Sequence, residues 1–196
     1  EMTPAQRDLA TKRACCGAQT RGLAYSNGKI FYNTLDGVVY ALNAENGKVV
    51  WKVENSNLAI SETMGFWILT GTLERFPKLQ VITVEPGLGW LPWFFESVLD
   101  ARMHQHYSFP GVKLLPSEYF KRQMGATFMY EPRGLKAAYD FFGPGRIFWS
   151  TDFPHPATCW PNSRQQVKEQ FETAGIPLED RRKIVSENAL GVFGLG

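Results

Sequence analysis

The sequence lacks the features that mark several large classes of protein. No run of about eighteen apolar residues is present to span a membrane, and residues 1–10 are polar and mixed in charge rather than a signal-peptide core. The formal net charge is only +2, and Lys and Arg are spread along the chain instead of forming a basic segment. We therefore expect neither a membrane nor a nucleic acid among the partners.

Cysteine is also scarce. The chain has three, and because Cys15 and Cys16 are adjacent, they cannot form the disulfide framework of a small secreted domain. The 196 residues are 44% hydrophobic and 20% charged, which permits a folded core and excludes a disordered chain. The first residue is Glu1 rather than Met, so we expect the chain to be incomplete at its front.

The residue pattern changes near Asn57. Before it, short β-prone runs alternate with the turn dipeptides Asn27-Gly28, Asp36-Gly37 and Asn46-Gly47, which favour hairpins because a type I′ turn needs positive φ at both central residues. The runs predict strands over 23–26, 29–34, 38–42 and 48–53. This is a small antiparallel β-meander with too little apolar area to stand alone.

After Asn57, amphipathic stretches alternate with single apolar runs, the pattern of parallel βα units. Strands are expected over 79–84, 125–130 and 146–150. Helices are expected over 62–75, 91–106, 116–123, 134–142, 161–174 and 178–190, with Gly143, Gly175 and Gly191 as C-terminal caps. The sequence therefore predicts an α/β fold: a partial (β/α) TIM-barrel half over 58–196, preceded by the β-meander within 1–57.

The N-terminal piece resembles the pyrroloquinoline-quinone alcohol dehydrogenases, which are β-propellers. The resemblance rests on the Cys15-Cys16 pair, on Arg21 and on the run from Ala41 to Trp51. It implies that the two cysteines form a vicinal disulfide beside the quinone and that Arg21 contacts this cofactor. A single blade cannot enclose a quinone, so the cofactor is not expected in this fragment. The two cysteines are therefore interpreted as an unpaired thiol pair.

The C-terminal piece resembles the amidohydrolase-related family of TIM-barrel proteins, which includes metal-dependent decarboxylases and hydrolases of carboxylated or lactone-like substrates. The resemblance begins near Met64, and its blocks are 71–79, 85–92, 116–119, 147–156 and 187–189. It implies a small-molecule substrate and a divalent metal, zinc or manganese. Asp152 matches the family's aspartate after the last barrel strand, which binds the metal and moves a proton; alternatively, it caps the following turn.

Further candidate site residues follow the predicted strands. Glu85, where many relatives carry a histidine, is either an acid or base or the anchor of a buried ion pair with Arg102 or Arg133. His155 is expected to contact substrate or support Asp152. Trp90 is a candidate substrate contact, although packing at a helix start is the competing interpretation. His104 and His106 lie two apart in a predicted helix and point to different sides, which argues against a metal pair.

These features predict an incomplete active site. A catalytic metal usually needs about three protein ligands. In this chain the resemblance assigns one metal ligand, Asp152. We therefore expect a decarboxylase or hydrolase fragment that is weak or inactive by itself. The alternatives are a module that completes a barrel as a homo-oligomer or with another chain, and a quinoprotein dehydrogenase fragment. The resemblances imply a cytoplasmic location for the amidohydrolase-like part and allow a periplasmic one for the quinoprotein-like part.

Overall fold

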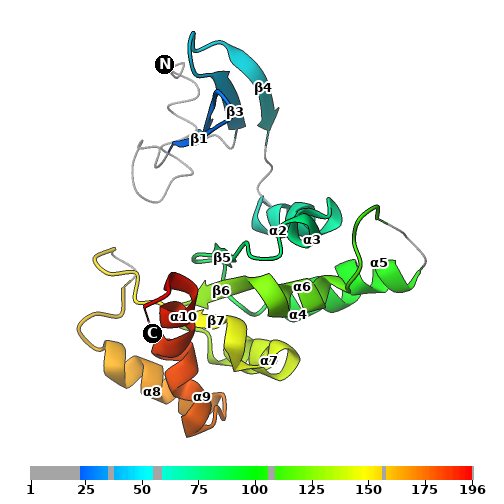
Figure 1. Cartoon of the computed structure of the whole chain (residues 1–196). Helices are drawn as coiled ribbons and strands as arrows, with labels where there is room; N and C mark the ends of the chain where they lie inside the picture. The colour runs from blue at the N-terminus through cyan, green and yellow to red at the C-terminus, as the bar shows by residue number, and fades with distance from the viewer. Residues whose placement is uncertain (1–22, 35–37, 55–58, 106–108, 156–157, 196) are drawn as a thin grey trace. The chain divides into compact units, whose positions relative to one another are not determined.

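The computed structural model describes residues 23–34, 38–54, 59–105, 109–155 and 158–195. The chain divides into two compact units, Glu1–Ala59 and Ile60–Gly196 (Figure 1). Each unit has its own sheet, antiparallel in the first and parallel in the second. Within the described ranges, no helix is long and apolar enough to cross a membrane. The fold is thus a mixed α/β fold.

The first unit contains a four-stranded antiparallel sheet in sequence order. Its strands are β1 (Ala24–Ser26), β2 (Lys29–Asn33), β3 (Val38–Asn43) and β4 (Val49–Glu54). Ser26 pairs with Lys29 across a two-residue turn, in which Asn27 and Gly28 have φ of 47° and 72°. Positive φ at both positions is what the Asn-Gly sequence favours.

This sheet buries little apolar surface. Val38 and Ala41 are its buried side chains among the described residues, while Tyr25 is 71% exposed. Aromatic pairs add cross-strand contacts: the stacked rings of Tyr32 and Tyr40 lie 5.2 Å apart. A sheet of this size with little buried apolar surface is expected to be marginal by itself, which stays a prediction.

The second unit is built on a three-stranded parallel sheet of order β5-β6-β7. The strands are β5 (Val81–Thr83), β6 (Met124–Phe128) and β7 (Ile147–Trp149), each within or beside a predicted run. Every residue of β6 is buried, as expected for a strand with a neighbour on both sides. The carboxyl ends of all three strands therefore lie at one edge of the sheet.

Helices connect these strands and cover the sheet (Figure 1). The helices between β4 and β6 are α2 (Ala59–Leu69), α3 (Thr72–Arg75), α4 (Leu91–Trp93), the π-helix η1 (Phe94–Asp100), α5 (Ala101–His104) and α6 (Pro116–Gln123). Those after β6 are α7 (Pro132–Phe142), the 3₁₀ helix η2 (Pro144–Arg146), α8 (Ser163–Thr173), α9 (Leu178–Arg182), the π-helix η3 (Lys183–Glu187) and α10 (Asn188–Phe193).

Two details of the helix prediction were wrong. The stretch 62–75 is not one helix, because Gly71 has φ of 70° and separates α2 from α3. Gly191 is not a cap but an interior residue of α10, which ends instead at Gly194 with φ of 65°. Gly143 and Gly175 do follow α7 and α8, with φ of 76° and 65°. Local composition thus located the helices but not every break.

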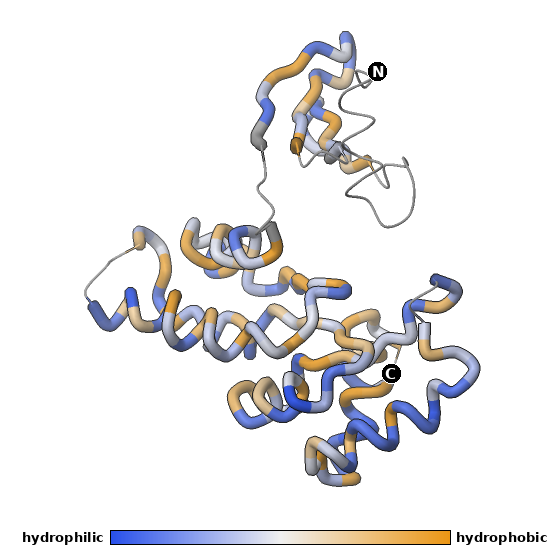
Figure 2. Tube along the Cα trace, turned by 180° about the vertical axis from the view of Figure 1, so that it is seen from behind, coloured by the Kyte–Doolittle hydropathy of each residue, from blue (hydrophilic) through white to orange (hydrophobic). Residues whose placement is uncertain are grey.

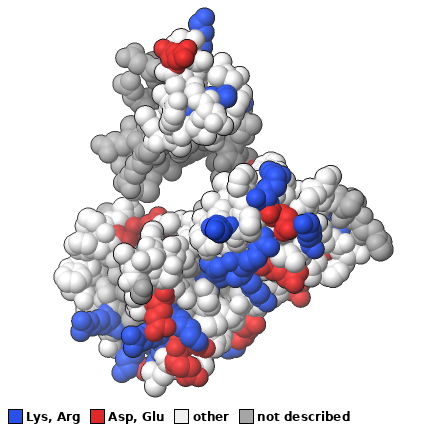
Figure 3. Space-filling model, in the orientation of Figure 1, with Lys and Arg blue, Asp and Glu red and all other residues white. Residues whose placement is uncertain are grey.

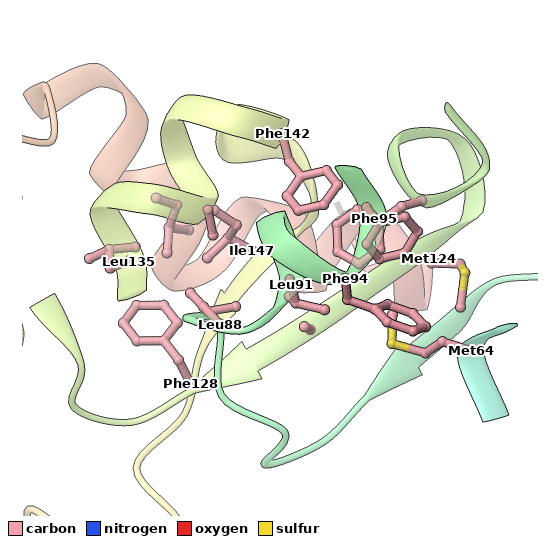
Figure 4. Close-up of a cluster of buried hydrophobic side chains, with 14 of the residues drawn as sticks. Met64, Leu88, Leu91, Phe94, Phe95, Met124, Phe128, Leu135, Phe142 and Ile147 are labelled. Atoms are coloured by element: carbon pink, nitrogen blue, oxygen red, sulfur yellow. The ribbon is translucent and has the colours of Figure 1, made fainter. Parts of the chain in front are cut away.

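The core of the second unit is rich in aromatic side chains (Figure 4). Phe95, Phe120 and Phe142 come from different helices, and their ring centroids lie 4.2–5.4 Å apart. Most of α8 is hydrophilic (Figure 2), and its apolar Val167 and Phe171, four residues apart, pack against this core. Burying these large rings contributes to the apolar stabilisation of the unit.

Polar contacts stabilise the second unit at the amino ends of its strands, on the side opposite their carboxyl ends. Glu74 lies 3.2 Å from Lys113 and 3.4 Å from Arg122, and Tyr119 donates a 2.9 Å hydrogen bond to it. The bond from Tyr119 is the main cause that lowers the pKa of the Glu74 carboxyl. Figure 3 shows Lys and Arg beside Asp and Glu over this unit. Charges at this edge are therefore paired within the fold, as expected for a stabilising face.

Candidate active site

The candidate catalytic side chains gather at the carboxyl edge of the parallel sheet. Glu85 follows β5 and Asp152 follows β7, with β6 between them. Neighbouring strands lie about 4.8 Å apart, so the ends of β5 and β7 are roughly 10 Å apart. Both residues have positive φ, 61° for Glu85 and 55° for Asp152. A backbone conformation that non-glycine residues seldom adopt therefore occurs at both carboxylates.

Asp152 and His155 form the tightest polar contact among the predicted site residues. Asp152 Oδ2 lies 2.7 Å from His155 Nδ1, and the two side chains are 16% and 31% exposed. The backbone N–H of His155 donates a 2.7 Å hydrogen bond to the carbonyl of Asp152, which closes the loop between the two residues. The carboxylate is thus placed beside an imidazole and stays open to solvent on another side.

Glu85 has an exposed side chain on a fixed backbone. Its N–H donates a 2.7 Å hydrogen bond to Thr127 Oγ1 on β6, which ties the loop after β5 to the next strand. Because Glu85 is exposed, an ion pair with Arg102 or Arg133 would lie at the surface rather than be buried. This geometry leaves the carboxylate accessible from the carboxyl edge.

Trp90 begins the helix after this loop. Its Nε1 donates a 2.9 Å hydrogen bond to Pro86 O, and its ring lies 5.4 Å from that of Phe94. The side chain is half-buried against the core. Packing, the competing interpretation from the sequence, accounts for these contacts, and a substrate contact remains a prediction.

Sequence reasoning missed Glu131, which follows β6. Its carboxylate accepts hydrogen bonds from Leu88 N at 2.6 Å and Gly89 N at 3.1 Å, and its own N–H donates to Gln170 Oε1 at 3.2 Å. The position directly after a buried strand, before Pro132, was the available signal. Glu131 therefore connects the loops after β5 and β6.

Exposed apolar side chains also lie in the segments that follow the three strands. Val84, Tyr130, Phe153 and Trp160 all follow strand ends and are 57–64% exposed. Phe153 and Trp160 contact each other edge to face, with centroids 5.6 Å apart. We call these four residues the apolar rim. Exposed apolar side chains that gather on one surface are typical of sites that contact a ligand or another chain.

The donor side chains do not fit a metal ion by themselves. In the part of the chain that the structure describes, no three His, Cys, Asp or Glu side chains stand close enough to hold one. His104 ends α5, whereas His106, Cys15, Cys16 and Arg21 lie outside the described residues. A divalent metal usually needs about three protein ligands, so this donor set is incomplete.

Comparison with known proteins identifies the larger part of the chain. The family profile described as Amidohydrolase matches residues 22–195. The chain belongs to the amidohydrolase family. Its fold is similar to that of 5-carboxyvanillate decarboxylase from Sphingomonas paucimobilis, with 26% identity and a TM-score of 0.59 over 71% of this chain and 41% of the other.

A second amidohydrolase-type structure supports the same fold. Dihydroxybenzoic acid decarboxylase from Polaromonas sp. JS666, solved with bound manganese and the inhibitor 2-nitroresorcinol, has 24% identity and a TM-score of 0.57. The match covers 70% of this chain and 40% of that one. This member of the amidohydrolase family thus spans about two fifths of the length of these solved structures.

A different similarity covers a shorter stretch. The lanthanide-dependent methanol dehydrogenase of Methylacidiphilum fumariolicum is 47% identical over 64 residues, which are 33% of this chain and 10% of that protein. Methanol dehydrogenase subunit 1 of Methylorubrum extorquens is 48% identical over 67 residues, 11% of its length. The chain therefore joins an amidohydrolase-related part to a short N-terminal part similar to pyrroloquinoline-quinone alcohol dehydrogenases.

Proposed function

We propose that the second unit carries part of an amidohydrolase-type site for decarboxylation or hydrolysis of a small carboxylated, amide or lactone substrate, and that the chain alone is weak or inactive. In this proposal, residues 58–196 are the C-terminal half of a (β/α) barrel and residues 1–57 a quinoprotein-like fragment. The observation that carries it is the pair of carboxylates with positive φ, Glu85 and Asp152, at one edge of a parallel sheet.

The backbone conformation at these two residues favours a site over a chance arrangement. Positive φ at a non-glycine residue costs on the order of 1 kcal/mol or more, and such residues cluster at active sites. Asp tolerates this region through local hydrogen bonds, whereas Glu does so less readily. Catalytic side chains of (β/α) barrels lie at the carboxyl ends of the strands, where both residues lie.

The roles follow from the contacts. Asp152 is proposed as the metal ligand and as a carboxylate that accepts or returns a proton, with His155 at 2.7 Å to hold it in place or contact substrate. Glu85 is proposed as the second acid or base because its side chain is exposed at the same edge. Trp90, half-buried just before α4, is the candidate aromatic contact for substrate.

The incomplete donor set is the reason to expect weak activity. When bound in relatives of this type, a divalent metal such as zinc or manganese polarises substrate oxygen and activates water. Here Asp152 and His155 are two donor side chains, and a third near them is missing within the described ranges. Metal affinity should therefore be low until another chain or segment adds donors.

Metal binding by the full chain tests this function. Equilibrium dialysis with Mn²⁺ or Zn²⁺ should show weak uptake that Asp152→Ala lowers further, while Glu172→Ala, which removes an exposed carboxylate on α8, should leave uptake unchanged. Aromatic carboxylates, amides and lactones should show little turnover. Uptake insensitive to Asp152→Ala would contradict the ligand assignment. Strong turnover that Asp152→Ala abolishes would contradict the proposed inactivity.

A second candidate function is assembly with another chain. In the described sheet β5 and β7 are the outer strands, and the apolar rim is exposed above them. Outer strands with free backbone groups and exposed apolar surface favour pairing with another chain. A second copy or a complementary barrel segment would fill this role. Light scattering tests it, because a well-folded monomer without a partner contradicts assembly.

A further inference from the structure

We propose that Glu131 is the positioning residue of the carboxyl edge: it fixes the loop after β5 and thereby the place of Glu85. The inference rests on the proposed function, because it concerns the loop that carries Glu85. The observations behind it are the hydrogen bonds and close contacts of Glu131. Glu131 follows β6, the central strand, so its side chain can reach the loop of the neighbouring strand.

Two charge-assisted hydrogen bonds make this link. The N–H groups of Leu88 and Gly89 donate to Glu131 Oε1 at 2.6 Å and to Oε2 at 3.1 Å. Each carboxylate oxygen thus holds one of two successive amides, which fixes both the position and the orientation of the loop. Hydrogen bonds to an ionised acceptor are worth more than neutral ones, and a buried amide left without its partner is costly.

Glycines make room for this carboxylate. A side chain at Gly87 would bring its Cβ within 3.2 Å of Glu131 Oε1, and Gly87 itself has φ of 70°. A Cβ at Gly134, on the first turn of α7, would collide with Glu131 Oε2 and lie 2.9 Å from Gly89 N. A Cβ at Gly134 would therefore displace the Glu131 carboxylate, and the positive φ of Gly87 also favours glycine there.

The backbone of Glu131 is in turn bound by Gln170. Its N–H donates to Gln170 Oε1 at 3.2 Å, and Gln170 Nε2 donates to Met129 O at 2.8 Å. Gln170 is 1% exposed and lies on α8, which follows the loop that carries Asp152. A buried amide whose oxygen and nitrogen are both bonded has little freedom. One connected set of contacts thus runs from the loop after β5 through Glu131 to Gln170 on α8.

Amide hydrogen exchange of the full chain tests the proposal without metal or substrate, so it can fail independently of the proposed function. Glu131→Gln keeps one side-chain oxygen as an acceptor and replaces the other with an NH₂ group, which would face the N–H of Leu88 or Gly89. Exchange at Leu88 and Gly89 should accelerate by about tenfold or more, and the Trp90 indole resonance should shift.

The matched control is Glu118→Gln. The Glu118 carboxylate also accepts a backbone hydrogen bond, from Leu115 N at 2.8 Å, but on α6 away from this edge. If Glu131 only stabilised the fold as a whole, both variants would show the same acceleration of amide exchange throughout the chain. If Glu131 positions the loop, only Glu131→Gln should accelerate amide exchange at Leu88 and Gly89 more than it accelerates exchange at core amides such as that of Phe128. Equal local changes in the two variants would overturn the proposal.

A second pair of variants decides the matter if Glu131→Gln does not fold. Gly134→Ala should displace the Glu131 carboxylate and accelerate exchange at Leu88 and Gly89, although alanine favours a helix. Gly191→Ala, in α10, meets no atom within 4 Å and should leave those amides unchanged. Unchanged exchange at Leu88 and Gly89 in Gly134→Ala would overturn the proposed positioning role.

Discussion

At the scale of single residues, Asp180 illustrates how charge is stabilised in the second unit. Tyr139 on α7 donates a 2.6 Å hydrogen bond to Asp180 Oδ2, and Lys183 lies 2.7 Å from Oδ1. The hydrogen bond from Lys183, followed by that from Tyr139, lowers the pKa of Asp180. The same contact with Asp180 raises the pKa of Tyr139 to about 12. The contacts therefore join α7 to the last helices.

The lowered pKa of Asp180 predicts a pH dependence of stability. Because the folded pKa lies below the ordinary value of 3.8, Asp180 stabilises the fold above pH 3.8 and loses this effect as pH falls through the folded pKa. Asp180→Asn should therefore be less stable than the wild type at pH 7, and the difference should shrink in acid. Urea unfolding at several pH values measures it.

An exposed ion pair serves as the control. Glu172 lies 3.9 Å from Lys168 on α8, with both side chains more than half exposed. Glu172→Gln should change the stability at pH 7 less than Asp180→Asn does. A constant difference between Asp180→Asn and the wild type from neutral to acid pH would refute the argument.

At the scale of elements, the helices before β6 depend on irregular points that pair with distant segments. Gly71 lies between α2 and α3, close to the carbonyls of Pro110 and Gly111. The π-helix η1 ends at buried Asp100, whose Oδ1 accepts a 3.0 Å hydrogen bond from Ser117 N on α6. Such irregular turns often serve a specific contact, here the joining of two helices.

Two glycines of this region should respond oppositely to alanine. Gly71→Ala should lower the free energy of unfolding by about 1 kcal/mol or more, since φ is 70° and the Cβ would lie 3.2 Å from Gly111 O. Gly65→Ala, inside α2 with its nearest neighbour 4.0 Å away, should raise it by about 0.5–1 kcal/mol. Denaturant titrations of the two variants check both signs. Equal effects would mean that φ at Gly71 does not matter.

At the scale of the whole molecule, incompleteness is the main feature. The chain spans about two fifths of the decarboxylase structures it resembles and about a tenth of the methanol dehydrogenases. Each described sheet is open, and apolar side chains in or directly after its outer strands, such as Val49 in β4 and Val84 after β5, are exposed to solvent. Folded proteins rarely leave such surfaces uncovered. Self-association is therefore the expected behaviour in solution.

The apolar rim should contribute to that association. Phe153→Ser removes a rim side chain that is 60% exposed, and it should weaken association by about tenfold or more without unfolding the chain. Phe76→Ser removes one that is 57% exposed before β5, at the opposite edge, and should have a smaller effect. Light scattering over a concentration series compares them. A stronger effect of Phe76→Ser would place the contact elsewhere.

Local residue patterns were enough to predict most of the helices and strands and their order. Turn dipeptides such as Asn27-Gly28 and apolar runs such as those of β5, β6 and β7 depend on local sterics and on local hydrophobic spacing, so they can be read without knowing the neighbours. The same reasoning located Asp152 and Glu85 at strand ends. The family resemblance added the expected chemistry, which the comparisons support at the level of the family and its fold.

Which of these residues contact one another depends on the folded arrangement of the chain. Glu131 binds amides of Leu88 and Gly89 more than forty residues earlier, and Gln170 binds Glu131 from another helix. Gly71 lies between α2 and α3, where a Cβ would meet the carbonyls of Pro110 and Gly111. Contacts between residues distant in the chain depend on how the strands align and how closely backbones approach, and no local pattern encodes either quantity.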